Sequence, residues 1–234
     1  MQDKIYLLSI GEILDEAEGE VLMAQVMDKV DANRRAKAER IKRQSAKAAC
    51  VGAGLLLQVA MRDALEKSGN KLPIVEKKKA SSDIHSNLIQ YSVGELLERI
   101  ESPILLEFMY GKNGKPYLRD YPFYFNLSHS GTYVVCVISE REIGVDIQEH
   151  RGGNVERIAK RYFHPEELQA LDKCEPAGRM KVFFDLWAAK EAYGKYTGDG
   201  IAESLEKEIP VNKVTLQLIH SIPGYSLAVC KGME

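Results

Sequence analysis

Hydrophobic and polar positions alternate along the chain in periods that predict both strands and helices. Short β-branched or aromatic runs predict strands at residues 4–10, 104–110, 133–138, 143–147, 214–219 and 225–230. Apolar positions at helical spacing predict helices at residues 18–30, 46–66, 155–162 and from about 176 to 196. Two start signals, the capping box Ser92-Val-Gly-Glu95 and Pro165 with the acids that follow it, predict two further short helices.

The order of these elements indicates the fold class. Helices and antiparallel hairpins are mixed in both halves, which is typical of an α+β fold rather than of βαβ winding. We expect residues 1–140 to form one lobe and residues 141–234 a second. The polar stretch from about residue 68 to residue 90 is longer than most connections within a compact domain, so we expect it to be a surface insertion in the first lobe.

Two carboxylates lie where the pattern predicts burial. Residues 143–147 are apolar except for Gly144 and Asp146, and a carboxylate in a buried strand is costly unless a cation or hydrogen-bond donors satisfy it. At helical spacing, Glu191 shares a face with Trp187 and therefore points into the protein. Two inward carboxylates near lysine residues predict a site for Mg²⁺ and phosphate.

Three short stretches resemble the signatures of 4′-phosphopantetheinyl transferases of the surfactin-synthetase type. They are Asn126-Leu127-Ser128-His129-Ser130, Gly144-Val145-Asp146-Ile147, and Trp187-Ala188-Ala189-Lys190-Glu191-Ala192 with Lys195. Their order and separation also match, and weaker similarity extends over most of the chain. The resemblance implies two similar lobes, each with a small antiparallel sheet and helices, related by a pseudo-two-fold axis. It also implies an active site between the lobes and a monomer.

The same resemblance implies a reaction. The enzyme would transfer the 4′-phosphopantetheine arm of coenzyme A to a serine of an apo acyl or peptidyl carrier protein, releasing adenosine 3′,5′-bisphosphate. Mg²⁺ would be held by Asp146, Gln148 and Glu191. Family members often have an acid in place of Gln148, so here either the amide oxygen ligates weakly or water takes its place. Glu191 or Glu167 would act as the base toward the serine, and Lys195 would contact the phosphates.

The resemblance also assigns residues to coenzyme A. The expected contacts are Lys37, Arg40 and Lys47 with the 3′-phosphate, His129 with the same phosphate, Ser128 near the pyrophosphate, the backbone of Lys115 and Pro116 around the adenine, and Lys190 and Lys195 near the phosphates. Arg43 is an alternative to any of the first three. Without the resemblance, a basic run such as residues 29–47 indicates a solvated helix face, and Glu167 a helix first-turn acid.

Composition and charge narrow the function. The chain is 45% hydrophobic and 28% charged with a net charge of −2, so only a local basic site is expected. No apolar run reaches the roughly 18 to 20 residues of a membrane span. The start does not resemble a signal peptide and the cysteines form no CxxC pair, so we expect a cytoplasmic protein.

Two other functions compete with the transferase hypothesis. The first is a non-catalytic module that binds coenzyme A or a nucleotide and has a degenerate metal site. The presence of Asp146, Glu191 and Lys195 together argues against such decay. The second is a nucleic-acid binder that uses residues 29–47. The net charge and the absence of aromatic residues in that run argue against it.

Overall fold

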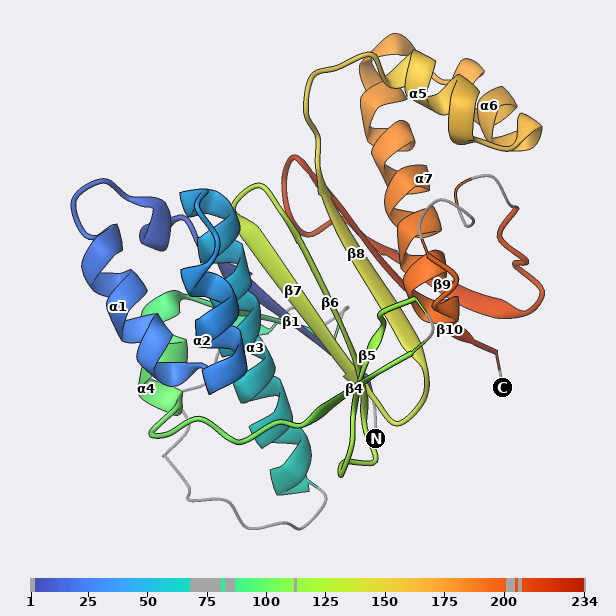
Figure 1. The fold of residues 1–234 in the computed structure, drawn as a ribbon. Coiled ribbons are helices and arrows are strands. Elements are labelled where there is room, and N and C mark those ends of the chain that lie inside the picture. The colour runs from blue at the N-terminus through green and yellow to red at the C-terminus, as the bar shows by residue number, and fades with distance from the viewer. Residues whose placement is uncertain are drawn as a thin grey trace. The chain divides into compact units, whose positions relative to one another are not determined.

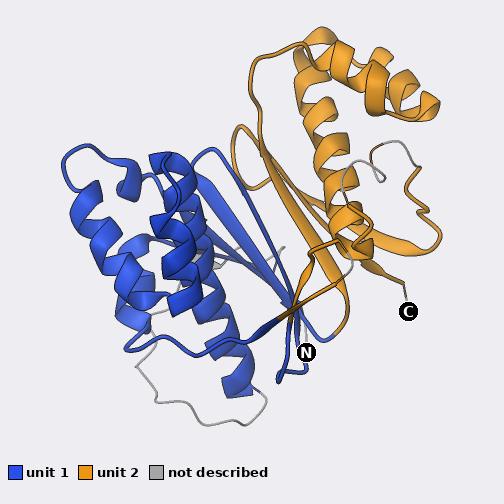
Figure 2. Cartoon of the chain, viewed as in Figure 1, with its two compact units in different colours: residues 1–108, 118–140 blue, residues 109–117, 141–234 orange. Residues whose placement is uncertain are grey.

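The chain folds into two compact units. The structure is a computed structural model that describes residues 3–67, 81–82, 87–111, 113–200, 205 and 208–233 (Figure 1). Unit 1 comprises residues 1–108 and 118–140, and unit 2 comprises residues 109–117 and 141–234 (Figure 2). Both units combine helices with small sheets, which confirms the predicted α+β class.

Unit 1 is built on a five-stranded sheet in the order β2-β3-β1-β7-β6. Its strands are β1 (Lys4–Ser9), β2 (Ser81–Ser82), β3 (Leu88–Tyr91), β6 (Tyr124–Ser130) and β7 (Tyr133–Ser139). Strand β1 is parallel to β3, and the other pairs are antiparallel. Because β1 lies in the middle of the sheet, the side chains of Ile5, Tyr6, Leu7 and Leu8 are all buried.

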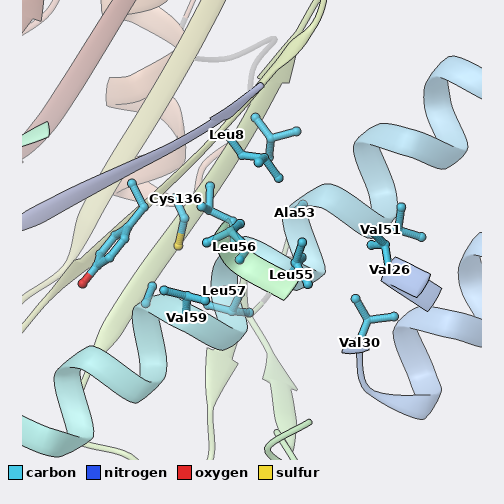
Figure 3. Packing of buried hydrophobic residues seen from close by; sticks show 14 of the residues in the cluster. Leu8, Val26, Val30, Val51, Ala53, Leu55, Leu56, Leu57, Val59 and Cys136 are labelled. Carbon is cyan, nitrogen blue, oxygen red and sulfur yellow. The ribbon is translucent and has the colours of Figure 1, made fainter. Parts of the chain in front are cut away.

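Helices α1 to α4 form the second layer of unit 1. They are α1 (Gly19–Lys29), α2 (Ala32–Glu39), α3 (Gln44–Lys67) and α4 (Val93–Arg99), with a short 3-10 turn at Glu12–Leu14. Helix α3 lies on the sheet and the other helices pack on α3 (Figure 1). Leucine, valine and alanine side chains fill the space between these layers (Figure 3). Helix α3 is long and apolar enough to cross a membrane, but 94% of its most apolar window is buried, as expected of a core helix.

One predicted strand is shorter than expected. Residues 104–107 form no strand, and β4 is confined to Phe108–Tyr110, which pairs with β5 (Pro116–Leu118). The buried side chain of Gln58 forms two hydrogen bonds with the backbone of Ile104. It donates to the carbonyl oxygen at 2.9 Å and accepts from the N–H at 2.6 Å. Ile104 therefore has its backbone hydrogen bonds without a strand partner.

The predicted capping box is confirmed. The hydroxyl of Ser92 accepts from the N–H of Glu95 and the Glu95 carboxylate accepts from the N–H of Ser92, at 3.3 and 2.7 Å. Most of the predicted insertion, residues 68–80 and 83–86, lies outside the described residues. Its expected end at residue 90 needs correction, because Leu88 and Tyr91 are buried and β3 pairs with β1.

Unit 2 consists of an antiparallel sheet covered by helices. The strands β8 (Ile143–Glu149), β9 (Val214–Ile219) and β10 (Tyr225–Gly232) lie in the order β8-β10-β9. Helix α7 (Pro176–Thr197) packs along β8 and β10, while α5 (Val155–Tyr162) and α6 (Pro165–Asp172) pack on α7 (Figure 1). All these elements are confirmed, and Gly198 ends α7 with a φ of +75°, as its position predicts.

Residues 109–117 are attached to the C-terminal end of α7. Lys115 donates to the carbonyl oxygen of Tyr196 at 3.0 Å and forms an ion pair with Glu142. Asn113 donates to the carbonyl oxygen of Gly198 at 2.8 Å. A cation at this end of the helix complements the negative end of its dipole. These bonds explain why the segment belongs to unit 2.

Candidate functional site

Asp146 on β8 is the centre of the candidate site. Its carboxylate is 1% exposed and forms an ion pair of 2.6 Å with Lys195 of α7. Residues two apart on a strand share a face, so Asp146 and Gly144 both face α7, and the absence of a side chain at Gly144 lets the helix come close. A Cβ at Gly144 would lie 2.1 Å from the carbonyl oxygen of Ala192, so the backbones of β8 and α7 are in direct contact.

Glu191 of α7 lies beside this ion pair. The indole N–H of Trp187, one helical turn earlier, donates to the Glu191 carboxylate at 2.7 Å. Burial and the neighbouring charge of Asp146 raise the pKa of Glu191 to about 7, although Lys195 and the Trp187 hydrogen bond act in the opposite direction. The two carboxylates predicted to face inward are therefore brought together, and both burial and the charge of Asp146 oppose the ionisation of Glu191.

The donor set of this cluster fits Mg²⁺. The carboxylates of Asp146 and Glu191 are the ligands that Mg²⁺ prefers, and a divalent cation would remove the cost of placing them together. In the part of the chain that the structure describes, no three His, Cys, Asp or Glu side chains converge as a metal site. Water and substrate phosphate would have to complete the shell. Gln148 donates from its amide nitrogen to Asp146 at 2.8 Å, which favours water over its oxygen as the third ligand.

Glu167 and Lys190 form a second pair in unit 2. The Lys190 side chain is 0% exposed, and its ammonium lies 2.9 Å from the Glu167 carboxylate. The same carboxylate accepts from the backbone N–H of His164 at 2.8 Å, closing the first turn of α6. This position is compatible with both roles expected of Glu167, as a base and as an acid in the first turn of a helix. The burial of Lys190 favours a role in holding Glu167 over a direct contact with coenzyme A.

The remaining predicted residues are divided between the two units. In unit 1, Ser128 is buried and His129 is exposed on β6, so the two side chains face opposite sides and form no dyad. Lys37 on α2, with Arg40 and Arg43 after it, is exposed, and Lys47 in the first turn of α3 is half-buried. In unit 2, the side chain of Lys115 is engaged with Glu142 and Tyr196, leaving the backbone of Lys115 and Pro116 for any ligand contact.

Two features of the site were not predicted. The indole bond to Glu191 follows from the four-residue spacing of Trp187 and Glu191, a signal that the sequence contains. Asp185 is bound by side chains from other elements, and its only signal is an acid among small and apolar residues on the sheet-facing side of α7.

We expect Glu191 to make the stability of the protein depend on pH and on Mg²⁺. Its pKa of about 7 lies above the ordinary value of 4.5, so between these values the folded state holds more protons than the unfolded state. The free energy of unfolding should therefore fall as pH rises through this range. Because Mg²⁺ favours the ionised carboxylate, it should raise Tm more at about pH 8 than at about pH 5.5. Thermal unfolding with and without Mg²⁺ measures this difference, and Glu191→Gln should remove most of it.

Comparisons with known proteins identify the family. A sequence profile described as the 4′-phosphopantetheinyl transferase superfamily matches residues 142–226, which contain Asp146, Glu167 and Glu191. The 4′-phosphopantetheinyl transferase HetI of Nostoc sp. (strain PCC 7120) is 37% identical over 131 residues, covering 53% of this chain and 55% of that protein. The 4′-phosphopantetheinyl transferase Sfp of Bacillus subtilis (strain 168) is 30% identical over 141 residues, with coverages of 53% and 62%.

A further relative is matched over more of its length. The 4′-phosphopantetheinyl transferase AcpT of Escherichia coli (strain K12) is 34% identical over 139 residues, covering 58% of this chain and 70% of AcpT. The chain spans about half the length of most of the curated relatives it matches. The matched region contains Asp146, Glu191 and Lys195 as well as the pair of Glu167 and Lys190. The chain belongs to the 4′-phosphopantetheinyl transferase superfamily.

Proposed function

We propose that the protein transfers the 4′-phosphopantetheine arm of coenzyme A to a serine hydroxyl of an apo carrier protein. The observation that carries this proposal is the partly buried cluster of Asp146, Glu191 and Lys195 in the region matched by the family profile. Two carboxylates and a cation on rigid elements suit a reaction in which a phosphoryl group moves between two oxygens. The names of the relatives support the same activity.

The residues of the cluster would have distinct roles. Asp146 and Glu191 would hold Mg²⁺, which when bound supplies charge stabilisation to the pyrophosphate. Lys195, 22% exposed, is within reach of both Asp146 and an incoming phosphate. Glu191, whose carboxylate lies beside Asp146, would also be placed to accept the proton of the attacking serine. Glu167, held by Lys190, is the alternative.

The basic run is proposed to bind the 3′-phosphate of coenzyme A. Lys37→Ala and Arg40→Ala should raise KM for coenzyme A by roughly tenfold, since each removes a charge-assisted contact. KM for dephospho-coenzyme A should change little. Lys42→Ala, an exposed cation in the same run, is the matched control. Equal losses with both substrates would contradict the assignment to the 3′-phosphate.

One experiment tests the function itself. The protein is mixed with coenzyme A, Mg²⁺ and a panel of apo acyl and peptidyl carrier proteins, and the carriers are weighed by mass spectrometry. A carrier that gains one phosphopantetheine supports the proposal. Binding of coenzyme A without any change in carrier mass across the panel would instead support the non-catalytic module.

A further inference from the structure

Helix α7 is fixed to the sheet of unit 2 at two separate places. At one end, Gly144 of β8 meets the backbone of Ala192 and Tyr196. At the other end, Asp185 accepts a hydrogen bond from Ser226 of β10, and His150, which follows β8, contacts the same Ser226 hydroxyl. As residue numbers rise along β8, the numbers of the contacting residues fall along α7, so the helix and the strand are antiparallel. Asp185 and Ala192 lie about two helical turns apart and therefore share the face that rests on the sheet.

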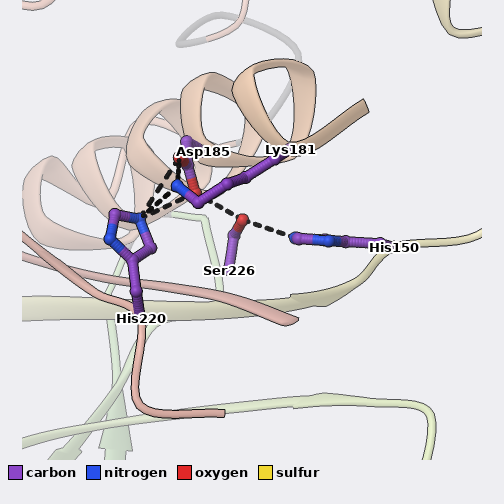
Figure 4. A network of polar contacts seen from close by, with 5 residues as sticks. All are labelled: His150, Lys181, Asp185, His220 and Ser226. Atoms are coloured by element: carbon purple, nitrogen blue, oxygen red, sulfur yellow. Dashed lines mark hydrogen bonds and ion pairs between the residues drawn. The ribbon is translucent and has the colours of Figure 1, made fainter. Parts of the chain in front are cut away.

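The attachment at Asp185 is a buried polar cluster (Figure 4). The hydroxyl of Ser226, which is 0% exposed, donates to Asp185 at 2.5 Å, and His150 contacts the same hydroxyl at 2.8 Å. The ring of His150 stacks on Phe184 of α7 with centroids 5.2 Å apart. Burial opposes ionisation of Asp185, but hydrogen bonds from Lys181 and Ser226 outweigh it and lower its pKa. Asp185 is thus a charged hydrogen-bond acceptor on α7 that binds Ser226 of β10.

Two more exposed side chains, Lys181 and His220, cover this cluster. Lys181, one turn before Asp185, forms an ion pair with it at 2.6 Å, and the ring of His220 lies 3.2 Å from both carboxylate oxygens. The side chains of Lys181 and His220 are 49% and 45% exposed, whereas that of Asp185 is 12% exposed. Water screens the outer ion pair, so the inner bond to Ser226 dominates the attachment.

The candidate metal site lies between the two attachments. Ser226 is the direct cross-strand partner of Gln148, and Ala228 is the partner of Asp146. On α7, Glu191 lies between Asp185 and the contact at Gly144. The attachments at Asp185 and at Gly144 therefore together set the rotation of α7 and its height over the sheet. They thereby set the position of Glu191 beside Asp146. Small residues at Ala188 and Ala189 provide no interlocking side chain that could replace the Asp185 attachment.

We infer that Asp185 is a positioning residue, whose bond to Ser226 holds Glu191 in the orientation that binds Mg²⁺. This inference rests on the proposed function of the Asp146 and Glu191 cluster. Asp185 touches neither acid, and it acts through the placement of α7. No family signature quoted above includes it.

The test uses a signal that does not depend on activity. Trp187 is the only tryptophan of the chain and donates to Glu191, so its indole N–H resonance reports on the metal site. Mg²⁺ is added to the full chain in the presence of coenzyme A, and the Mg²⁺ concentration that half-shifts this resonance is measured. Asp185→Ala should raise this concentration about tenfold or more, as loss of outer supporting groups does in other metal sites.

Conservative and control variants separate positioning from stability. Asp185→Asn keeps an oxygen that accepts from Ser226, so its midpoint should stay within about threefold of wild type. Lys181→Met, which removes the exposed ion pair and the contact of Lys181 with His220, should leave the midpoint unchanged. Leu227→Ala removes a buried side chain on the opposite face of β10, so it should lower Tm without moving the midpoint.

The possible results distinguish a failure of the positioning role of Asp185 from a failure of the proposed metal site. A wild-type midpoint retained in Asp185→Ala would overturn the inference while leaving the proposed metal site intact. If the wild-type resonance does not respond to Mg²⁺, the metal assignment fails and this inference fails with it. Should Asp185→Ala not fold, as judged by circular dichroism, Ser226→Ala takes its place, and an unchanged midpoint in that variant would overturn the inference.

Discussion

Asp146→Ala and Glu191→Gln are each expected to lower turnover by roughly a hundredfold or more, because each removes charge stabilisation from the transferring phosphoryl group. Asp146 is buried in an ion pair with Lys195, and Glu191 is the carboxyl with the raised pKa. Initial rates measured against Mg²⁺ concentration for both variants check this. Near-normal turnover of Glu191→Gln at saturating Mg²⁺ would show that Glu191 is neither an essential ligand nor the base.

Gln148→Glu adds an acid to the candidate site, whereas the two variants above remove one. It places a third acid on the face of β8 that carries Asp146, so half-maximal activity should need less Mg²⁺. In wild type, the Gln148 amide nitrogen faces Asp146, and the substitution exchanges this donor for an acceptor. If the Mg²⁺ curve does not move, residue 148 lies outside the metal shell and water is the third ligand.

Gly144→Ala is expected to destabilise the protein by about 3 kcal/mol or more, since overpacking of this severity forces backbone to move. The added Cβ would lie 2.1 Å from the carbonyl oxygen of Ala192 and 2.4 Å from the backbone nitrogen of Tyr196. Neither atom belongs to a side chain that could rotate away. Chemical denaturation followed by circular dichroism measures the loss.

A second glycine gives the control for this prediction. Gly178, in the first turns of α7, has open space around the position of a Cβ. Gly178→Ala should be neutral or stabilise by up to about 1 kcal/mol, because alanine has the higher helix propensity. A similar free energy of unfolding for both variants would mean that the contact between β8 and α7 is less close than the structure indicates.

Much of the fold follows from local patterns in the sequence. The strands and helices of unit 2 appear where periodicity and start signals place them, and Pro165 and Gly198 mark helix ends by their own backbone preferences. Strand β4 was predicted too long because the partner that satisfies Ile104 is a glutamine side chain from α3, far away in sequence. Local periodicity carries no information on such a bond.

In the candidate site too, some features follow from local sequence patterns and others depend on tertiary contacts. Burial of Asp146 and the inward face of Glu191 follow from periodicity, and two inward carboxylates near lysine residues predict a common site for these acids. The pairing of Lys190 with Glu167 and of Asp185 with Ser226 depends on tertiary packing. For these residues the sequence shows only polar side chains on buried faces, and the partner comes from an element 23 or 41 residues away.

The attachment of residues 109–117 has a consequence for how the protein is made. This segment emerges from the ribosome before residues 118–140 of unit 1, yet Asn113 and Lys115 bind the end of α7, at Gly198 and Tyr196. Unit 2 therefore cannot reach its final contacts while only the first half of the chain exists. A fragment that begins at residue 141 would leave Glu142 and the last carbonyl groups of α7 without these partners, so no single cut of the chain separates the two units intact.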